Sequence, residues 1–227
     1  MHLKPLYGLV AGAALAMAAS SAGATVTFVG YQTALNADET LVTSFEGGPA
    51  LSDVAIALPG FSLTGDGALF TGSKVAVSAA PGFSATTRDE TQYLSLQAKK
   101  SAFLDTPEVT AISFYVGSLD RHNKFTFNLA DGTTQVITGS ILAGLPGMDA
   151  NGSWTGFTTN GRLRFSFDSA ITSVLFDAGA NSLEISDVAA VIGATAVPEP
   201  AAWGMMILGF GGMGALMRRR RRAAAFA

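Results

Sequence analysis

The chain has 227 residues, of which 48% are hydrophobic and only 14% are charged, and it contains no cysteine. This length allows one domain of ordinary size plus targeting segments, and the lack of cysteine excludes disulfides, thiolate metal sites and a cysteine nucleophile. All 17 acidic residues lie between Asp38 and Glu199 together with only eight basic ones, so this central part carries a net charge of −9. Such an acidic body lacks the basic face that nucleic-acid binding requires, and we expect no nucleic-acid partner.

The first 24 residues have the pattern of a secretory signal peptide. Lys4 supplies a short positive region, and an uncharged apolar run follows at residues 6–19. Ala22 and Ala24 bound a small-residue cleavage site, which predicts that the exported protein begins at Thr25. A permanent N-terminal anchor is the alternative, but the apolar run is short for crossing a bilayer.

The body, residues 25–192, shows the two-residue alternation of half-buried antiparallel strands. Four segments place one set of side chains inward: Leu41, Thr43 and Phe45; Ile112, Phe114 and Val116; Phe125, Phe127 and Leu129; Leu163, Phe165 and Phe167. In the last segment Arg162, Arg164 and Ser166 are expected to face outward. Glycine, proline and asparagine turn signals separate the segments, and Asp131 with Gly132 predicts a tight hairpin. We therefore predict an all-β domain, an antiparallel β-sandwich or jelly roll.

Catalytic motifs are scarce in this body. His122 lies between two predicted strands, and no serine-hydrolase or zinc-protease motif accompanies it, so we interpret it as a polar loop residue. Adjacent acids such as Asp89 and Glu90 point to opposite sides of a strand. They could hydrolyse a glycoside only if two carboxyl groups faced each other across a cleft. We expect no enzymatic activity and no obligatory cofactor.

Two kinds of binding site are the alternatives to a purely structural body. Loop acids of an acidic exported β domain could hold a calcium ion, and Asp120 and Asp187 are the candidate ligands. Exposed aromatic rings could stack on sugars, and Trp154 and Tyr115 are the candidates. Solvated loop acids and core packing are the structural alternatives for these four residues.

The C-terminus has three parts in order. Residues 193–200 form a linker that ends in a non-helical break at Pro198, Glu199 and Pro200. Residues 201–217 are uncharged and predict a transmembrane helix of about 26 Å, near the lower limit for a bilayer, with Trp203 as its interfacial aromatic. Residues 218–227 are a cytoplasmic tail whose basic run stops translocation. That run comprises Arg218, Arg219, Arg220, Arg221 and Arg222.

This tail resembles the PEP-CTERM sorting signal of Gram-negative bacteria in its PEPxxWA form. Pro198, Glu199, Pro200 and Trp203 match, as do the run at residues 205–211 and the arginines, while Gly204 replaces the usual alanine. In that family an exosortase, a membrane-embedded cysteine protease, recognises the tail and removes the helix. The resemblance implies an exosortase partner, a precursor tethered to the inner membrane, and a final place at the cell surface or in the extracellular matrix. It also suggests a link with exopolysaccharide or biofilm.

The body adds a weaker resemblance to other surface proteins with this tail. Residues 93–96, 114–120 and 183–188 carry the likeness, and the last segment is similar to the final strand of jelly-roll carbohydrate-binding modules. We predict a structural or adhesive surface protein. A carbohydrate-binding module, calcium-dependent or not, is the second hypothesis, and an extracellular hydrolase is the third.

Overall fold

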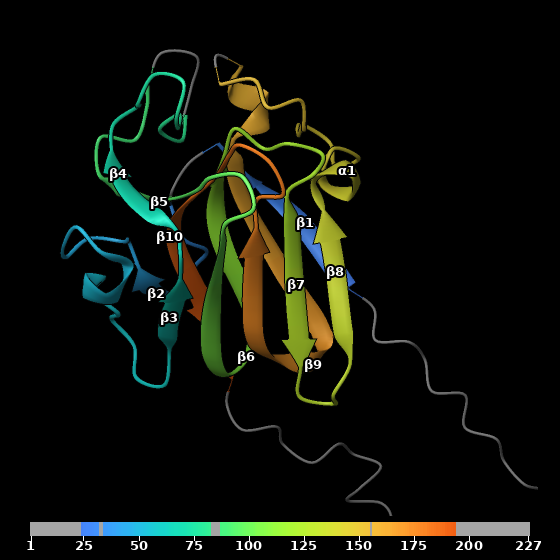
Figure 1. Ribbon diagram of the computed structural model, residues 1–227. Helices are drawn as coiled ribbons and strands as arrows, with labels where there is room; N and C mark the ends of the chain where they lie inside the picture. Colours follow the sequence, from blue (N-terminus) through green and yellow to red (C-terminus); the bar gives the residue numbers. More distant parts are fainter. Residues whose placement is uncertain (1–23, 32–33, 83–86, 155, 194–227) are drawn as a thin grey trace, which may run out of the picture.

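A computed structural model describes residues 24–31, 34–82, 87–154 and 156–193, and this part of the chain is built mainly of strands (Figure 1). The strands are β1 (Ala24–Gly30), β2 (Thr40–Thr43), β3 (Ser62–Gly65), β4 (Ala68–Thr71), β5 (Gln92–Leu96), β6 (Ser101–Gly117), β7 (Lys124–Leu129), β8 (Thr134–Thr138), β9 (Gly161–Asp177) and β10 (Leu183–Val191). The helical elements are α1 (Gly139–Leu142) and two 3-10 turns, Leu51–Asp53 and Phe157–Thr159. None of these helices has the length and apolar character that a membrane crossing needs. The predicted spanning segment 201–217 lies outside the described residues.

The strands form one antiparallel sheet, which confirms the prediction of an all-β antiparallel domain. The main order is β4-β5-β10-β6-β9-β7-β8, while β1, β2 and β3 pair with β9, β10 and β6. The predicted hairpin joins β7 to β8. Oδ1 of Asp131 accepts a hydrogen bond from the Thr133 N–H at 2.8 Å, and Gly132 has a φ of +82°, a value that favours glycine.

The two longest strands, β6 and β9, bend so that the sheet packs against itself. Phe165 and Phe176 are eleven residues apart in β9, which would separate them by about 36 Å in a straight strand. Both rings nevertheless lie beside Phe114, with centroid distances of 4.9 and 5.1 Å. The bend falls at residues 167–170 of β9, where the pairing register with β6 shifts. The halves of each strand therefore face each other across the core.

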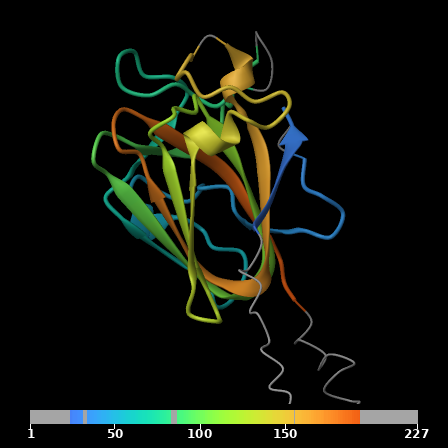
Figure 2. The same cartoon turned by 90° about the vertical axis from the view of Figure 1, so that its right-hand side faces the viewer.

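This bend divides the sheet into two layers. The first layer contains β4, β5, β10, β2 and β1 with residues 111–117 of β6 and 161–167 of β9. The second contains β3, β7 and β8 with the other halves of β6 and β9. Figure 2 shows β1 on one side of the molecule and the β7–β8 hairpin on the other.

The predicted inward side chains make up much of the core between the layers. Phe125, Phe127 and Leu129 are buried, and so are Ile112, Phe114 and Val116. Leu41 and Phe167 are only partly buried. Burying each large apolar side chain contributes about 1.5–3 kcal/mol, so this interior drives the bend.

The outer face of the first layer is also buried, which the alternation in the sequence did not predict. Arg162, expected to face outward, has no exposed surface, because further chain covers this face. The Tyr115 hydroxyl donates to the Gly82 carbonyl at 2.6 Å, and Oδ1 of Asn160 accepts from the Gly82 N–H at 2.7 Å. The segment around Gly82 therefore packs over β6 and encloses a polar layer outside the apolar core.

Candidate binding site

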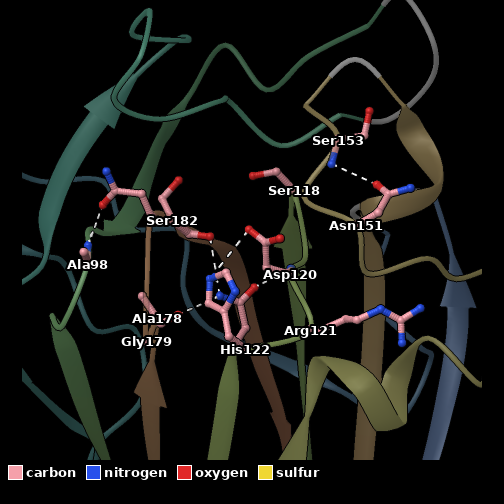
Figure 3. A network of polar contacts seen from close by, with 12 residues as sticks. Ala98, Ser118, Asp120, Arg121, His122, Asn151, Ser153, Ala178, Gly179 and Ser182 are labelled. Atoms are coloured by element: carbon pink, nitrogen blue, oxygen red, sulfur yellow. Dashed lines mark hydrogen bonds and ion pairs between the residues drawn. The ribbon is translucent and has the colours of Figure 1, made fainter.

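A hollow of about 230 Å³ opens where the loops at the ends of β6 and β10 meet. Its lining comes from residues 73–79, from Ser118 and Asp120 after β6, from Gly152 and Trp154, and from Asn181 and Ser182 before β10. Figure 3 shows Ser118, Asp120 and Ser182 brought together from these separate loops. Loops fixed by rigid strand ends are a common location of binding sites.

The floor of the hollow is organised by Glu184, the second residue of β10, whose side chain is fully buried. Its carboxylate accepts hydrogen bonds from the hydroxyls of Ser78 at 2.9 Å, Ser182 at 2.5 Å, and Ser118. Burial raises the pKa of Glu184, while these hydroxyls and the Ala79 backbone N–H act in the opposite direction. Three serines from three chain segments thus converge on one buried acid, and all three line the hollow.

Asp120 stands at the edge of the hollow and is held there by the turn at Asn151 and Gly152. The Gly152 N–H donates to the Leu119 carbonyl at 3.0 Å, and Asn151 forms a bridge with Asp120. At Gly152 φ is +67° and a Cβ would lie 2.4 Å from Oδ1 of Asp120, so the position requires glycine. The Asp120 carboxylate lies 3.7 Å from Nε2 of His122 and accepts no hydrogen bond from the described residues. Burial raises the pKa of Asp120, which the charge of His122 opposes.

The rim of the hollow carries three exposed apolar side chains. Trp154 is 59% exposed, Val75 92% and Val77 41%. The carbonyl of Trp154 accepts a hydrogen bond from Nη2 of Arg88 at 2.6 Å, which ties its loop to the neighbouring segment. Single exposed apolar residues are ordinary, but three around one polar hollow are typical of a ligand site.

The polar groups of the site are arranged for hydrogen bonding. The Ser118 hydroxyl donates to Glu184, whereas His122 pairs with Asp120, so these residues do not form a nucleophile and base in hydrogen-bond contact. What the hollow offers is a set of fixed oxygen atoms beneath an exposed aromatic ring. Such a set can hold a polar ligand that has one flat apolar face.

The structure separates the two predicted stacking residues. Trp154 lies on the rim of the hollow and is available to a ligand. Tyr115 is fully buried, so its proposed role as an exposed stacking ring is wrong. Its hydroxyl bonds to the Gly82 carbonyl, and burial raises its pKa. The side chain faces away from the apolar core, but the segment around Gly82 covers it.

The two predicted calcium ligands are not brought together. Asp120 lies beside His122, whereas the charged neighbour that most affects Asp187 is Arg162. Among the described residues no three acidic, histidine or cysteine side chains are placed to share a metal ion. The arrangement of the described side chains therefore gives calcium at Asp120 and Asp187 no support.

The predicted sorting and processing residues fall largely outside the described part. This holds for the signal peptide up to residue 23, the Pro198, Glu199 and Pro200 break, Trp203 and the arginine run. The predicted signal-peptide cleavage site lies between Ala24 and Thr25. Thr25 is the second residue of β1 and pairs with Ser166 of β9.

Sequence reasoning did not predict the buried role of Glu184 or its three serine partners. The signal was present, because Glu184 is an acid between Leu183 and Ile185 in a mostly apolar strand. A charge in such a strand indicates a buried partner set, since an isolated buried charge is costly. The partners, 66 and 106 residues away in the cases of Ser118 and Ser78, could not be identified from spacing.

Comparisons with known proteins identify the tail and leave the body without a close relative. A family model described as the PEP-CTERM protein-sorting motif matches residues 196–222. No curated protein matches the chain significantly. A solved structure of the catalytic domain of a GH87 alpha-1,3-glucanase in complex with nigerose is similar at a TM-score of 0.38 and 15% identity, over 74% of this chain and 31% of that one. The catalytic unit of a thermostable GH87 alpha-1,3-glucanase from Streptomyces thermodiastaticus strain HF3-3 gives 0.28 and 16%, over 63% and 28%. This chain thus spans less than a third of their length, and likeness at these scores is no argument about activity.

Proposed function

We propose that this chain, which carries a PEP-CTERM protein-sorting motif, is an exported surface or matrix protein with a structural or adhesive, non-enzymatic body. The single observation that carries the proposal is the match of residues 196–222 to the sorting motif. An exosortase-type protease is the processing partner, and the inner membrane holds the precursor through residues 201–217. The released protein resides at the cell surface or in the extracellular matrix, where exopolysaccharide is a candidate partner.

The body of this protein is, in our proposal, a β-sandwich. The packing of Phe114 against rings from both halves of β9 supports this classification. The domain runs from residue 25 to residue 192, and residues 193–200 link it to the membrane segment. An acidic surface on this body fits a secreted protein and disfavours nucleic acid.

Processing at both ends is the expected result in the producing bacterium. The mature protein should lack residues 1–24 and the residues beyond the Pro198, Glu199 and Pro200 region, because both ends are sorting segments. Intact-mass and peptide mass spectrometry of surface and medium fractions measure this. A strain without its exosortase should retain the arginine-containing tail in the membrane fraction. Recovery of a released protein that still contains residues 218–222 would exclude the proposed processing.

Carbohydrate binding is the second candidate function, and the exposure of Trp154 beside a polar hollow favours it. An aromatic ring stacks on the apolar face of a sugar, and nearby fixed oxygens bind its hydroxyl groups. Replacing Trp154 with alanine should reduce retention of the protein on purified exopolysaccharide from the same cells. A surface tryptophan of no function would leave retention unchanged, and Val136→Ala, at another exposed apolar residue, serves as the matched control.

A further inference from the structure

We propose that the hollow beside Trp154 is a subsite for one neutral sugar ring, with a floor that accepts hydrogen bonds from the hydroxyl groups of that ring. The proposal rests on the carbohydrate-binding candidate and adds which ligand groups the site recognises. It also assigns Glu184 as the positioning residue that orients the floor.

The orientation of the serine hydroxyls follows from the chemistry of a carboxylate. While Glu184 is ionised, its carboxylate has only acceptor sites, so each serine that bonds to it must direct its single proton toward it. The lone pairs of Ser118 and Ser182 are then left for the hollow that both residues line. No other described group donates to these two hydroxyls. The third hydroxyl, of Ser78, also accepts a hydrogen bond from Tyr93 at 3.3 Å, so it has less capacity left for a ligand.

The polar groups at the edge of the hollow add another hydrogen-bond acceptor and a donor. Asp120 presents a carboxylate that accepts no hydrogen bond from the described residues. Asn181 uses its Oδ1 to accept from the Ala98 N–H at 2.6 Å, so its amide nitrogen is left to donate. The site is therefore rich in acceptors, and the Asn181 amide is a neutral donor at its side. Sugar hydroxyls both donate and accept, and they match this set without a charge on the ligand.

The negative charge of Asp120 at the edge of the hollow selects against acidic sugars. The only formal charges among the lining residues are those of Asp120 and Lys74, and Lys74 lies on the exposed rim. A ligand carboxylate at the floor would meet acceptors in place of donors and would be repelled by Asp120. Neutral hexoses are therefore preferred over uronic acids.

The size of the hollow limits the ligand to one ring. About 230 Å³ is below the roughly 300–1,000 Å³ of sites that enclose drug-sized molecules. Trp154 stands on the rim and covers one face of a ring that enters, while its carbonyl stays bound to Arg88. A longer glycan would place one residue in the hollow and continue into solvent.

The fluorescence of Trp154 measures ligand binding to the hollow. The chain has two tryptophans, and Trp203 belongs to the sorting motif, so a Trp203→Phe background leaves Trp154 as the only indole. Full-length protein in a non-glycosidic detergent is titrated with methyl glycosides of glucose, galactose and mannose, and with glucuronate and galacturonate. At least one neutral glycoside should shift the Trp154 fluorescence saturably, and its acidic counterpart should bind at least tenfold more weakly.

Calorimetric titration of a variant at the edge of the hollow and of a distant control then tests the placement of the ligand. Asp120→Asn should weaken binding of the neutral glycoside by roughly 10–100-fold, because a hydrogen bond to a charged group contributes about 1.5–3 kcal/mol. Asp131→Asn, in the exposed turn of the β7–β8 hairpin, is the matched control and should leave binding unchanged. If no neutral glycoside binds, the subsite and the carbohydrate-binding candidate both fail. If a glycoside binds but Trp154→Ala and Asp120→Asn leave its affinity intact, only the placement fails.

The role of Glu184 has its own readout, which a purely structural role would not change. A deoxyfluoro sugar accepts hydrogen bonds but cannot donate them, so replacing the hydroxyl that faces the floor should weaken binding at least tenfold. In Glu184→Gln the amide donates toward one serine, and that serine can turn its proton into the hollow. The penalty for fluorine at that position should then shrink several-fold. Ser182→Ala leaves Glu184 and two of its hydroxyl partners in place. It should also reduce the loss of binding caused by fluorine at the sugar position that faces the floor. An unchanged fluorine penalty in both variants overturns the assignment.

Discussion

Replacement of Arg162 by methionine should lower the free energy of unfolding by about 3–5 kcal/mol, because it removes a buried charge with its hydrogen bonds and leaves the nearby acid Asp187 uncompensated. Arg162 has no exposed surface. Its guanidinium donates to the Ser113 hydroxyl at 2.8 Å and to the Asp187 carbonyl at 2.9 Å. Burial lowers the pKa of Arg162, while the charge of Asp187 acts in the opposite direction. Methionine matches much of the side-chain volume but leaves Asp187 without its positive neighbour.

The control for this variant is an ion pair at the surface. Nζ of Lys100 lies 3.1 Å from the Asp66 carboxylate, and the two side chains are 45% and 52% exposed. An ion pair of this kind contributes about 0–1 kcal/mol, so Lys100→Met should cost little. Urea denaturation followed by circular dichroism measures both variants on the same protein.

A second substitution distinguishes lost charge pairing from lost packing. Adding Asp187→Asn to Arg162→Met removes the unpaired acid, and asparagine tolerates the positive φ of 45° at this position. The double variant should therefore recover part of the lost stability. Equal costs for Arg162→Met and Lys100→Met would show that burial of Arg162 is not energetically important.

Arg162 also shows what the alternation pattern in the sequence could not predict. The alternation of Leu163 and Phe165 with polar residues correctly assigned the apolar face of β9, because a strand turns successive side chains to opposite faces. It could not say what covers the other face. Beside Tyr115 that cover comes from Gly82, which is 33 residues away in the chain and lies outside any periodic segment. An arginine on the face opposite the apolar core is therefore assigned to solvent by pattern even when it is buried.

The candidate site likewise combines a turn that neighbouring residues predict with a floor formed by residues far apart in the chain. The turn at Asn151 and Gly152 was predicted from its residues, and it presents Trp154 at the rim of the hollow. The polar floor joins loops from four parts of the chain, and only the pairing of the strands brings these together. Tyr115 was misassigned for the same reason as Arg162, since both lie on the outer face of the first layer. Sequence thus predicted the exposed Trp154 and the sorting motif, whereas the floor required the fold.

The aromatic contacts across the bend give the second large effect. Phe114→Ala should destabilise the domain by about 3–5 kcal/mol, because it opens a cavity among rings that cannot fully collapse into it. The Phe114 ring lies 5.2 Å from that of Phe125, 4.9 Å from Phe165 and 5.1 Å from Phe176. Phe70→Ala is the matched control, because Phe70 is on an edge strand, is only partly buried and meets Tyr93 at 6.5 Å. Its cost should stay below about 2 kcal/mol.

A double-mutant cycle between Phe114 and Phe176 tests the two-layer packing itself. Phe114 belongs to the half of β6 in the first layer, and Phe176 to the half of β9 in the second. In a straight, open sheet these rings would be too far apart to interact, and their substitutions by leucine would be additive. With the bend they should be coupled by about 0.5–1.5 kcal/mol, the energy of an aromatic pair beyond its buried area. Phe70 and Phe176 share no ring contact and should show no coupling. Additivity for both pairs would therefore contradict the packing of the two halves of β9 against each other.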